Sequence, residues 1–109
     1  MSTSGQVFRA RVRFLTHDEG GRLNLAMSGF RPQLRVGEIS TSAIVRSVAG
    51  DAYFDTGVEV EVDIELMHWD VYGHLLSHED QVVLLEGSRT VAMGVFVAQT
   101  FDDPADGAE

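Results

Sequence analysis

The residues best suited to chemistry in this sequence are three histidines and three carboxylates that fall within thirteen residues. They are His68, Asp70, His74, His78, Glu79 and Asp80. Imidazole and carboxylate groups are common ligands of zinc and nickel, but His74 and His78 share a face only where the segment is helical. A polar hairpin or a short surface helix explains the same composition. We therefore predict that the chain has no metal site.

The sequence contains no known motif for nucleotide binding or for a catalytic nucleophile. The chain contains no lysine, so the lysine of a phosphate-binding Gly-x-x-x-x-Gly-Lys loop is missing. It has no Gly-x-Ser-x-Gly segment, and the absence of cysteine excludes disulfides and thiolate zinc sites. We predict a protein that is not an enzyme, binds no GTP and carries no cofactor.

Arginines at alternate positions form a second candidate site. Arg9, Arg11 and Arg13 lie on one face of a predicted strand, with neighbours roughly 6.6 Å apart, which approximates the spacing of successive phosphates. A second alternating segment presents four acids: Glu59, Glu61, Asp63 and Glu65. We favour a cross-strand ladder, in which each pair contributes only about 0.2–1 kcal/mol but the set determines the register. Such a ladder removes the positive potential that a nucleic acid requires.

Apolar residues alternate with polar ones through much of the chain, which is typical of half-buried strands. The alternation and the intervening turn residues predict strands at residues 7–14, 33–36, 42–48, 58–66, 82–85 and 89–98. No stretch combines helical periodicity with capping signals. We predict an all-β fold, a six-stranded antiparallel closed β-barrel. Its expected core includes Phe8, Val12, Phe14, Val60, Val62 and Ile64.

The predicted domain organisation is simple. Residues 1–6 form a flexible N-terminus, residues 7–101 the barrel, and residues 102–109 an acidic disordered tail. The last strand is apolar on both faces: Val91, Met93, Val95 and Val97 share one face, and Ala92, Phe96 and Ala98 share the other. One face must line the barrel, and the other is covered by a loop or forms an interface.

Three segments, in this order and approximate spacing, resemble the C-terminal (third) domain of elongation factor Tu. The first runs from Phe8 to Arg22, the second is Ser28-Gly29-Phe30-Arg31-Pro32-Gln33, and the third is Glu86-Gly87-Ser88-Arg89-Thr90-Val91-Ala92-Met93-Gly94-Val95. The resemblance implies a stand-alone, translation-related barrel of bacterial type that is not itself a GTPase. It places Arg22, Ser42, Glu86 and Gly87 where the family contacts tRNA. It places Arg31, Pro32 and Gln33 where the family meets its GTPase domain.

Charge distribution favours a protein over RNA as the partner. Residues 1–46 carry seven arginines and three acids, a net +4, whereas residues 47–109 carry one arginine and fourteen acids, a net −13. The alternative is an RNA-associated module on tRNA or the ribosome. With no signal peptide and no membrane segment in view, we expect a cytoplasmic, non-catalytic protein-interaction module. It binds a protein or a second copy of itself through Phe30, Arg31, Pro32, Gln33, Arg89, Met93 and Val95.

Overall fold

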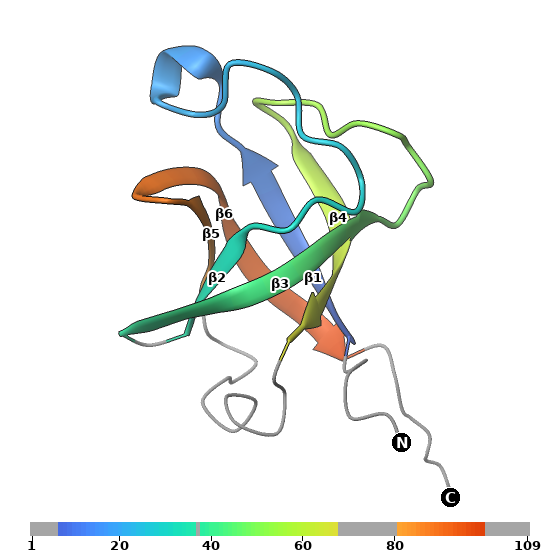
Figure 1. Ribbon diagram of the computed structural model, residues 1–109. Helices are drawn as coiled ribbons and strands as arrows, with labels where there is room; N and C mark the ends of the chain where they lie inside the picture. Colours follow the sequence, from blue (N-terminus) through green and yellow to red (C-terminus); the bar gives the residue numbers. More distant parts are fainter. Residues whose placement is uncertain (1–6, 37, 68–80, 100–109) are drawn as a thin grey trace, which may run out of the picture.

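The computed structural model describes residues 7–36, 38–67 and 81–99, which form one closed barrel. Its strands are β1 (Val7–Phe14), β2 (Gln33–Val36), β3 (Ile39–Ser47), β4 (Glu59–Leu66), β5 (Gln81–Glu86) and β6 (Arg89–Gln99). They follow the order β1-β4-β3-β2-β5-β6 around the barrel, and every neighbouring pair is antiparallel. The predicted fold class is confirmed (Figure 1).

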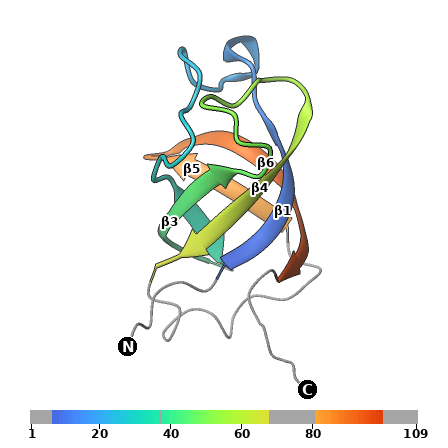
Figure 2. The ribbon, with the colours of Figure 1, turned by 90° about the vertical axis from the view of Figure 1, so that its right-hand side faces the viewer.

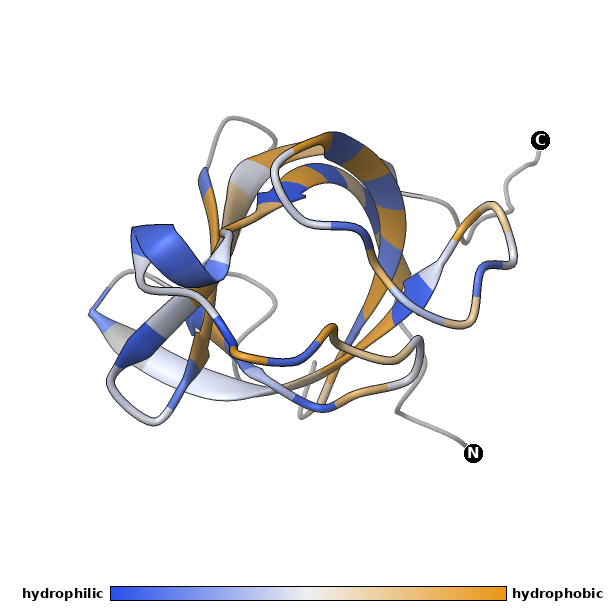
Figure 3. Ribbon diagram, turned by 90° about the horizontal axis from the view of Figure 1, so that it is seen from above, coloured by the Kyte–Doolittle hydropathy of each residue, from blue (hydrophilic) through white to orange (hydrophobic). Residues whose placement is uncertain are grey.

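Apolar and polar residues alternate along the strands, so apolar side chains fill the barrel interior and polar side chains face solvent. Phe8, Val12, Phe14, Val62 and Ile64 are buried as predicted, and Val60 is partly buried against them. Arg11 and Glu61 lie on the solvent side, so the predicted register is confirmed. Figure 3 shows the resulting bands of hydrophilic and hydrophobic residues along the strands, and Figure 2 shows β3, β4 and β1 side by side.

Aromatic side chains fill both ends of the interior. Near the start of β1, the rings of Phe8 and Phe96 have centroids 5.3 Å apart. At the other end of β1, Phe14 stacks on Phe54 at 4.8 Å, and Phe30 tilts against both rings. Edge and offset contacts of this kind add to the energy of burial. They also anchor the long β1–β2 and β3–β4 connections, which lie over the same end of the barrel (Figure 1).

A short helical turn follows β1, and it was not among the elements predicted from the sequence. The 3-10 turn His17–Glu19 is capped by Thr16, whose hydroxyl accepts a hydrogen bond from the Glu19 amide while the Glu19 carboxylate accepts one from the Thr16 amide. Gly20 ends the turn at φ 96°. Three residues are too few to show helical periodicity, although the Thr-x-x-Glu capping pattern was visible in the sequence.

Gly94 allows the barrel to close. It lies opposite Val12 in the β1–β6 pairing, and a Cβ at this position would collide with the Arg11 carbonyl oxygen and lie 2.6 Å from the Val12 Cα. Both obstacles are backbone atoms, so neither moves unless β1 moves. A glycine inside a strand commonly marks such a close backbone approach.

We predict that Gly94→Ala destabilises the protein by about 3 kcal/mol, because the added methyl group forces β1 and β6 apart. Gly50→Ala is the control: Gly50 has φ 88° but open space around it, so the substitution costs about 1 kcal/mol of backbone strain. Urea unfolding of both variants measures the difference. Equal losses would show that the strands do not approach as closely as described.

Candidate interaction surface

The three arginines of β1 face acids rather than empty solvent. In the β1–β4 register Arg9 lies opposite Asp63 and Arg11 opposite Glu61. Arg9 donates from Nε to Asp63 Oδ1 at 2.8 Å and from Nη2 to Oδ2 at 3.3 Å, whereas Arg11 Nη2 reaches Glu61 Oε2 at 3.5 Å. These contacts confirm the predicted ladder for two of the three arginines. The exposed Arg11–Glu61 pair contributes little energy. Together with the part-buried Arg9–Asp63 pair, it neutralises this face.

Arg13 departs from the predicted ladder. Its cross-strand neighbour is Glu59, but its guanidinium instead donates to Glu19 Oε2 at 2.8 Å. The hydrogen bond from Arg13, with one from the Thr16 amide, lowers the pKa of Glu19 to about 2. Hydrogen bonding to Glu19 likewise raises the pKa of Arg13, and hydrogen bonding to Asp63 raises the pKa of Arg9. Glu19, Arg13 and Arg9 are therefore ionised at neutral pH.

An apolar stripe runs along the outside of β6, directly beside the arginines. Met93, Val95 and Val97 are 45%, 46% and 41% exposed. Met93 lies opposite Arg13, and Val95 opposite Arg11, in the β1–β6 register. The surface therefore changes from acidic on β4, through neutralised arginine on β1, to apolar on β6. We call Met93, Val95 and Val97 the β6 stripe.

Val91 was assigned by alternation to the same face as Met93, and this prediction is wrong. Val91 is 1% exposed and belongs to the core. The β5–β6 pairing passes from Leu84–Ala92 to Leu85–Thr90 and skips Val91, so a bulge reverses the alternation there. Val97 is skipped in the same way between β1 and β6. Strict alternation cannot predict which residue a bulge leaves unpaired.

The structure divides the predicted partner-binding residues between two places. Phe30 packs on the aromatic cluster and Pro32 is fully buried, which leaves only Arg31 and Gln33 exposed in that segment. Gln33 pairs with Leu85 of β5, so β5 separates this segment from the β6 stripe. Arg89 is exposed at the start of β6, after the β5–β6 turn.

The residues placed at tRNA contacts by resemblance are partly brought together. Arg22 Nε lies 3.0 Å from Glu86 Oε1, and its guanidinium lies 5.8 Å from the centre of the Phe30 ring. Gly87 follows Glu86 in the tight β5–β6 turn at φ 63°. Ser42 is on β3, opposite Gln33, so β2 lies between it and β5. Arg22 is thus already engaged by an acid and an aromatic ring.

Sequence reasoning missed a second apolar surface, formed by the two long connections. Leu23, Leu25, Met27 and Tyr53 are among the most exposed large apolar side chains of the described residues. Met27 and Tyr53 form a cross-strand pair in an isolated antiparallel bridge. The signal was present as apolar residues at alternate positions from 23 to 27, in a segment that is not a predicted strand.

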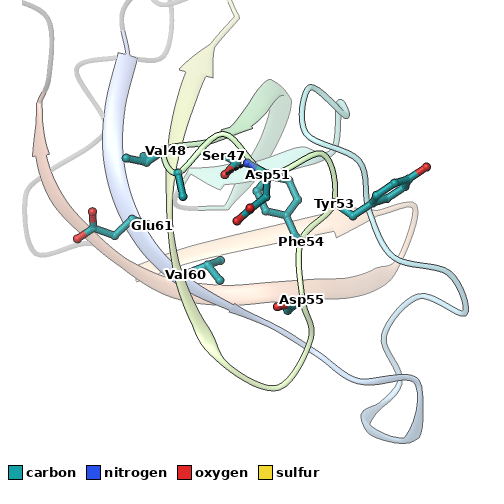
Figure 4. Close-up of a pocket in the computed structure, with 9 residues that line it drawn as sticks. Ser47, Val48, Asp51, Tyr53, Phe54, Asp55, Val60 and Glu61 are labelled. Carbon is teal, nitrogen blue, oxygen red and sulfur yellow. Dashed lines mark hydrogen bonds between the residues drawn. The ribbon is translucent and has the colours of Figure 1, made fainter.

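A pocket opens beside Tyr53, within the β3–β4 connection (Figure 4). Its volume is about 200 Å³. The lining residues are Ser47, Val48, Ala49, Asp51, Tyr53, Phe54, Asp55, Val60 and Glu61. Phe54 and Val60 supply an apolar wall, and Asp51 and Asp55 supply carboxylates on the loop side.

Comparison with known protein families gives no assignment: no family model matches this sequence. The histidine cluster His68, His74 and His78 lies outside the described residues. Among those that are described, no group of three or more acidic or histidine side chains is arranged to hold a metal ion. No helix in the described part of the chain has the length and apolar character needed to cross a membrane.

The pKa of Glu19 predicts a pH-dependent contribution to stability. Because folding lowers this pKa from an ordinary value of 4.5 to about 2, ionised Glu19 stabilises the fold above pH 4.5, and this contribution is lost as the pH falls through about 2. We expect Glu19→Gln to have a lower melting temperature than the parent at pH 7, with the gap closing between about pH 4.5 and 2. Thermal unfolding monitored by circular dichroism measures the gap. Glu59→Gln controls for the loss of one exposed charge, and a gap independent of pH would contradict the assignment.

Proposed function

We propose that this chain is a non-catalytic protein-interaction module, related in fold and in its translation context to the third domain of elongation factor Tu. The β6 stripe is the observation that carries the proposal. Three large apolar side chains, each more than two-fifths exposed, lie at successive outward positions of one strand. A contiguous apolar surface on a soluble domain commonly marks a contact site for another protein.

The neighbouring ladder supports a protein rather than a nucleic acid at this face. Arg9 and Arg11 are held by Asp63 and Glu61, so they offer little net positive charge to a phosphate backbone. A protein interface tolerates such a surface well, because paired charges can form a polar rim around an apolar centre. Arg89, at the start of β6, adds one exposed cation to this side of the barrel.

Glutamates on the β6 stripe are the direct test. We expect Met93→Glu and Val95→Glu, made together, to reduce binding of the native partner at least about tenfold, because each change places a charge in an apolar contact. Affinity capture from the native cytoplasm, followed by titration of the purified partner, measures the loss. Ser40→Glu is the matched control, since Ser40 is exposed on β3, which lies opposite β6 in the barrel. Equal capture by the parent and the double variant would contradict the proposal.

The same variants separate a foreign partner from a second copy of the chain. If the β6 stripe forms a homodimer, sedimentation velocity of the purified parent shows a dimer and the double variant sediments as a monomer. A parent that is monomeric and captures a second protein identifies a foreign partner. A parent protein that is monomeric and captures no other protein would contradict the proposed interaction function.

An RNA-associated module is the second candidate, and one feature of β2 favours it. Arg35 is exposed on the outer side of β2, and Arg31 is exposed just before the strand begins. Buried residues alternate with them along the chain. Neither forms an ion pair with any of the described acids. Two such cations can neutralise only two phosphates, and the net charge of −9 on the chain repels the rest of the phosphate backbone.

We therefore predict no saturable submicromolar binding of tRNA at physiological salt. Mobility shifts with charged and uncharged tRNA at several salt concentrations provide the measurement. Arg22→Ala and the double change Arg31→Ala with Arg35→Ala should have little effect on any residual shift. Tight binding with a steep salt dependence, abolished by either variant, would rank the RNA function above the protein one.

A further inference from the structure

The β3–β4 connection forms a surface at the end of the barrel that is held by backbone hydrogen bonds. Its residues 52–54 run antiparallel to residues 26–28: the Ser28 amide donates to the Ala52 carbonyl at 2.8 Å, and the Phe54 amide donates to the Ala26 carbonyl at 2.9 Å. Ala26 and Phe54 are buried beneath this pair of segments. Met27 and Tyr53 lie on its outer side, 55% and 52% exposed.

Hydrogen bonds also hold the wall of the neighbouring pocket. The Ser47 hydroxyl accepts hydrogen bonds from the Gly50 and Asp51 amides, both at 3.1 Å, and the Ser47 amide donates to the Ser28 hydroxyl at 2.8 Å. Gly50 adopts φ 88° within this turn, a conformation that favours glycine. The turn that carries Asp51 is therefore fixed before any ligand arrives, which reduces the entropic cost of binding.

The charges of the pocket are of one sign. Asp51 and Asp55 are exposed, and the described residues give neither carboxylate an ion pair or a side-chain hydrogen bond. No arginine or histidine lines the pocket. The third acid, Glu61, is engaged by Arg11, and its carboxylate points away from Asp51 and Asp55 (Figure 4). Two uncompensated carboxylates thus stand against the apolar wall of Phe54 and Val60.

We propose that this surface binds a partner-protein segment in which one arginine or lysine is flanked by apolar residues. A cavity of about 200 Å³ has room for one long side chain rather than for a larger ligand. The aliphatic stem of such a side chain packs on Val60 and Phe54 while its charged end reaches Asp51 and Asp55. The flanking apolar side chains rest on Met27 and Tyr53.

This site goes beyond the proposed β6 contact. It is formed by the β3–β4 connection together with Val60 of β4 and Met27 of the β1–β2 connection. It shares no residue with the β6 stripe and stands whether or not the β6 stripe binds a partner. Its negative charge opposes a phosphate backbone, so charge complementarity selects a basic protein segment over RNA. A second copy of this chain could occupy the site only with an exposed arginine, because the sequence contains no lysine.

Titration of the ¹⁵N-labelled protein with acetyl-Leu-Arg-Leu-amide, followed by amide chemical shifts, tests the proposal. We expect saturable shifts at residues 47–55, 60 and 61, and at residues 23–28. Acetyl-Leu-Gln-Leu-amide, which lacks the positive charge, should bind about tenfold more weakly, because it forms neither charge pair. Asp51→Asn with Asp55→Asn should weaken binding of the arginine peptide about tenfold, since two exposed charge pairs are lost.

Asp18→Asn is the matched control, because it removes an exposed carboxylate from the helical turn after β1 and should change the affinity by less than about twofold. The spectrum of each variant reports whether the barrel remains folded. Equal shifts with the arginine and glutamine peptides, or shifts confined to β6, would overturn the proposal. Shifts at residues 47–55 on concentrating the protein alone would identify a second copy as the occupant and would also overturn it.

Discussion

The surface of this protein depends on one constraint: β1 is hydrogen-bonded on both sides, to β4 and to β6. The second pairing is possible because Gly94 leaves room for the β1 backbone at Arg11 and Val12. Closure leaves none of the six strands as a free sheet edge in the described barrel. It also fixes the neighbours of every outward residue, so the arginines of β1 lie between the acids of β4 and the apolar residues of β6.

This placement explains why the arginine-rich strand is a poor anion site. Spacing alone makes Arg9, Arg11 and Arg13 resemble a phosphate-binding stripe, but Asp63, Glu61 and Glu19 each engage one of them. The positive charge without an acidic partner among the described residues lies elsewhere, at Arg31, Arg35 and Arg89. The surfaces available for contact are instead apolar: the β6 stripe on the barrel wall and the Met27–Tyr53 pair at the loop end.

Much of the barrel could be predicted because alternation along a strand records which side faces the core. The predicted strand at residues 7–14 matches β1 and that at 33–36 matches β2, whereas β3 begins three residues before its prediction. Bulges could not be predicted, since Val91 is apolar whichever way it points. Arg13 pairs with Glu19 rather than Glu59, because the capped turn brings the Glu19 carboxylate within hydrogen-bond distance. The pocket depends on how the two long connections pair, which no local pattern specifies.

The closure of the barrel at β1 is tested most directly by cross-strand nuclear Overhauser effects in the intact protein. Backbone protons of Val12 are expected to show contacts to Gly94 of β6 and, in the same sample, to Val60 of β4. Both sets should survive in Glu61→Gln, because the exposed ladder contributes little energy beside the backbone pairing. Contacts to Val60 without contacts to Gly94 would describe an open sheet, and the position of the β6 stripe beside the neutralised arginines would then be contradicted.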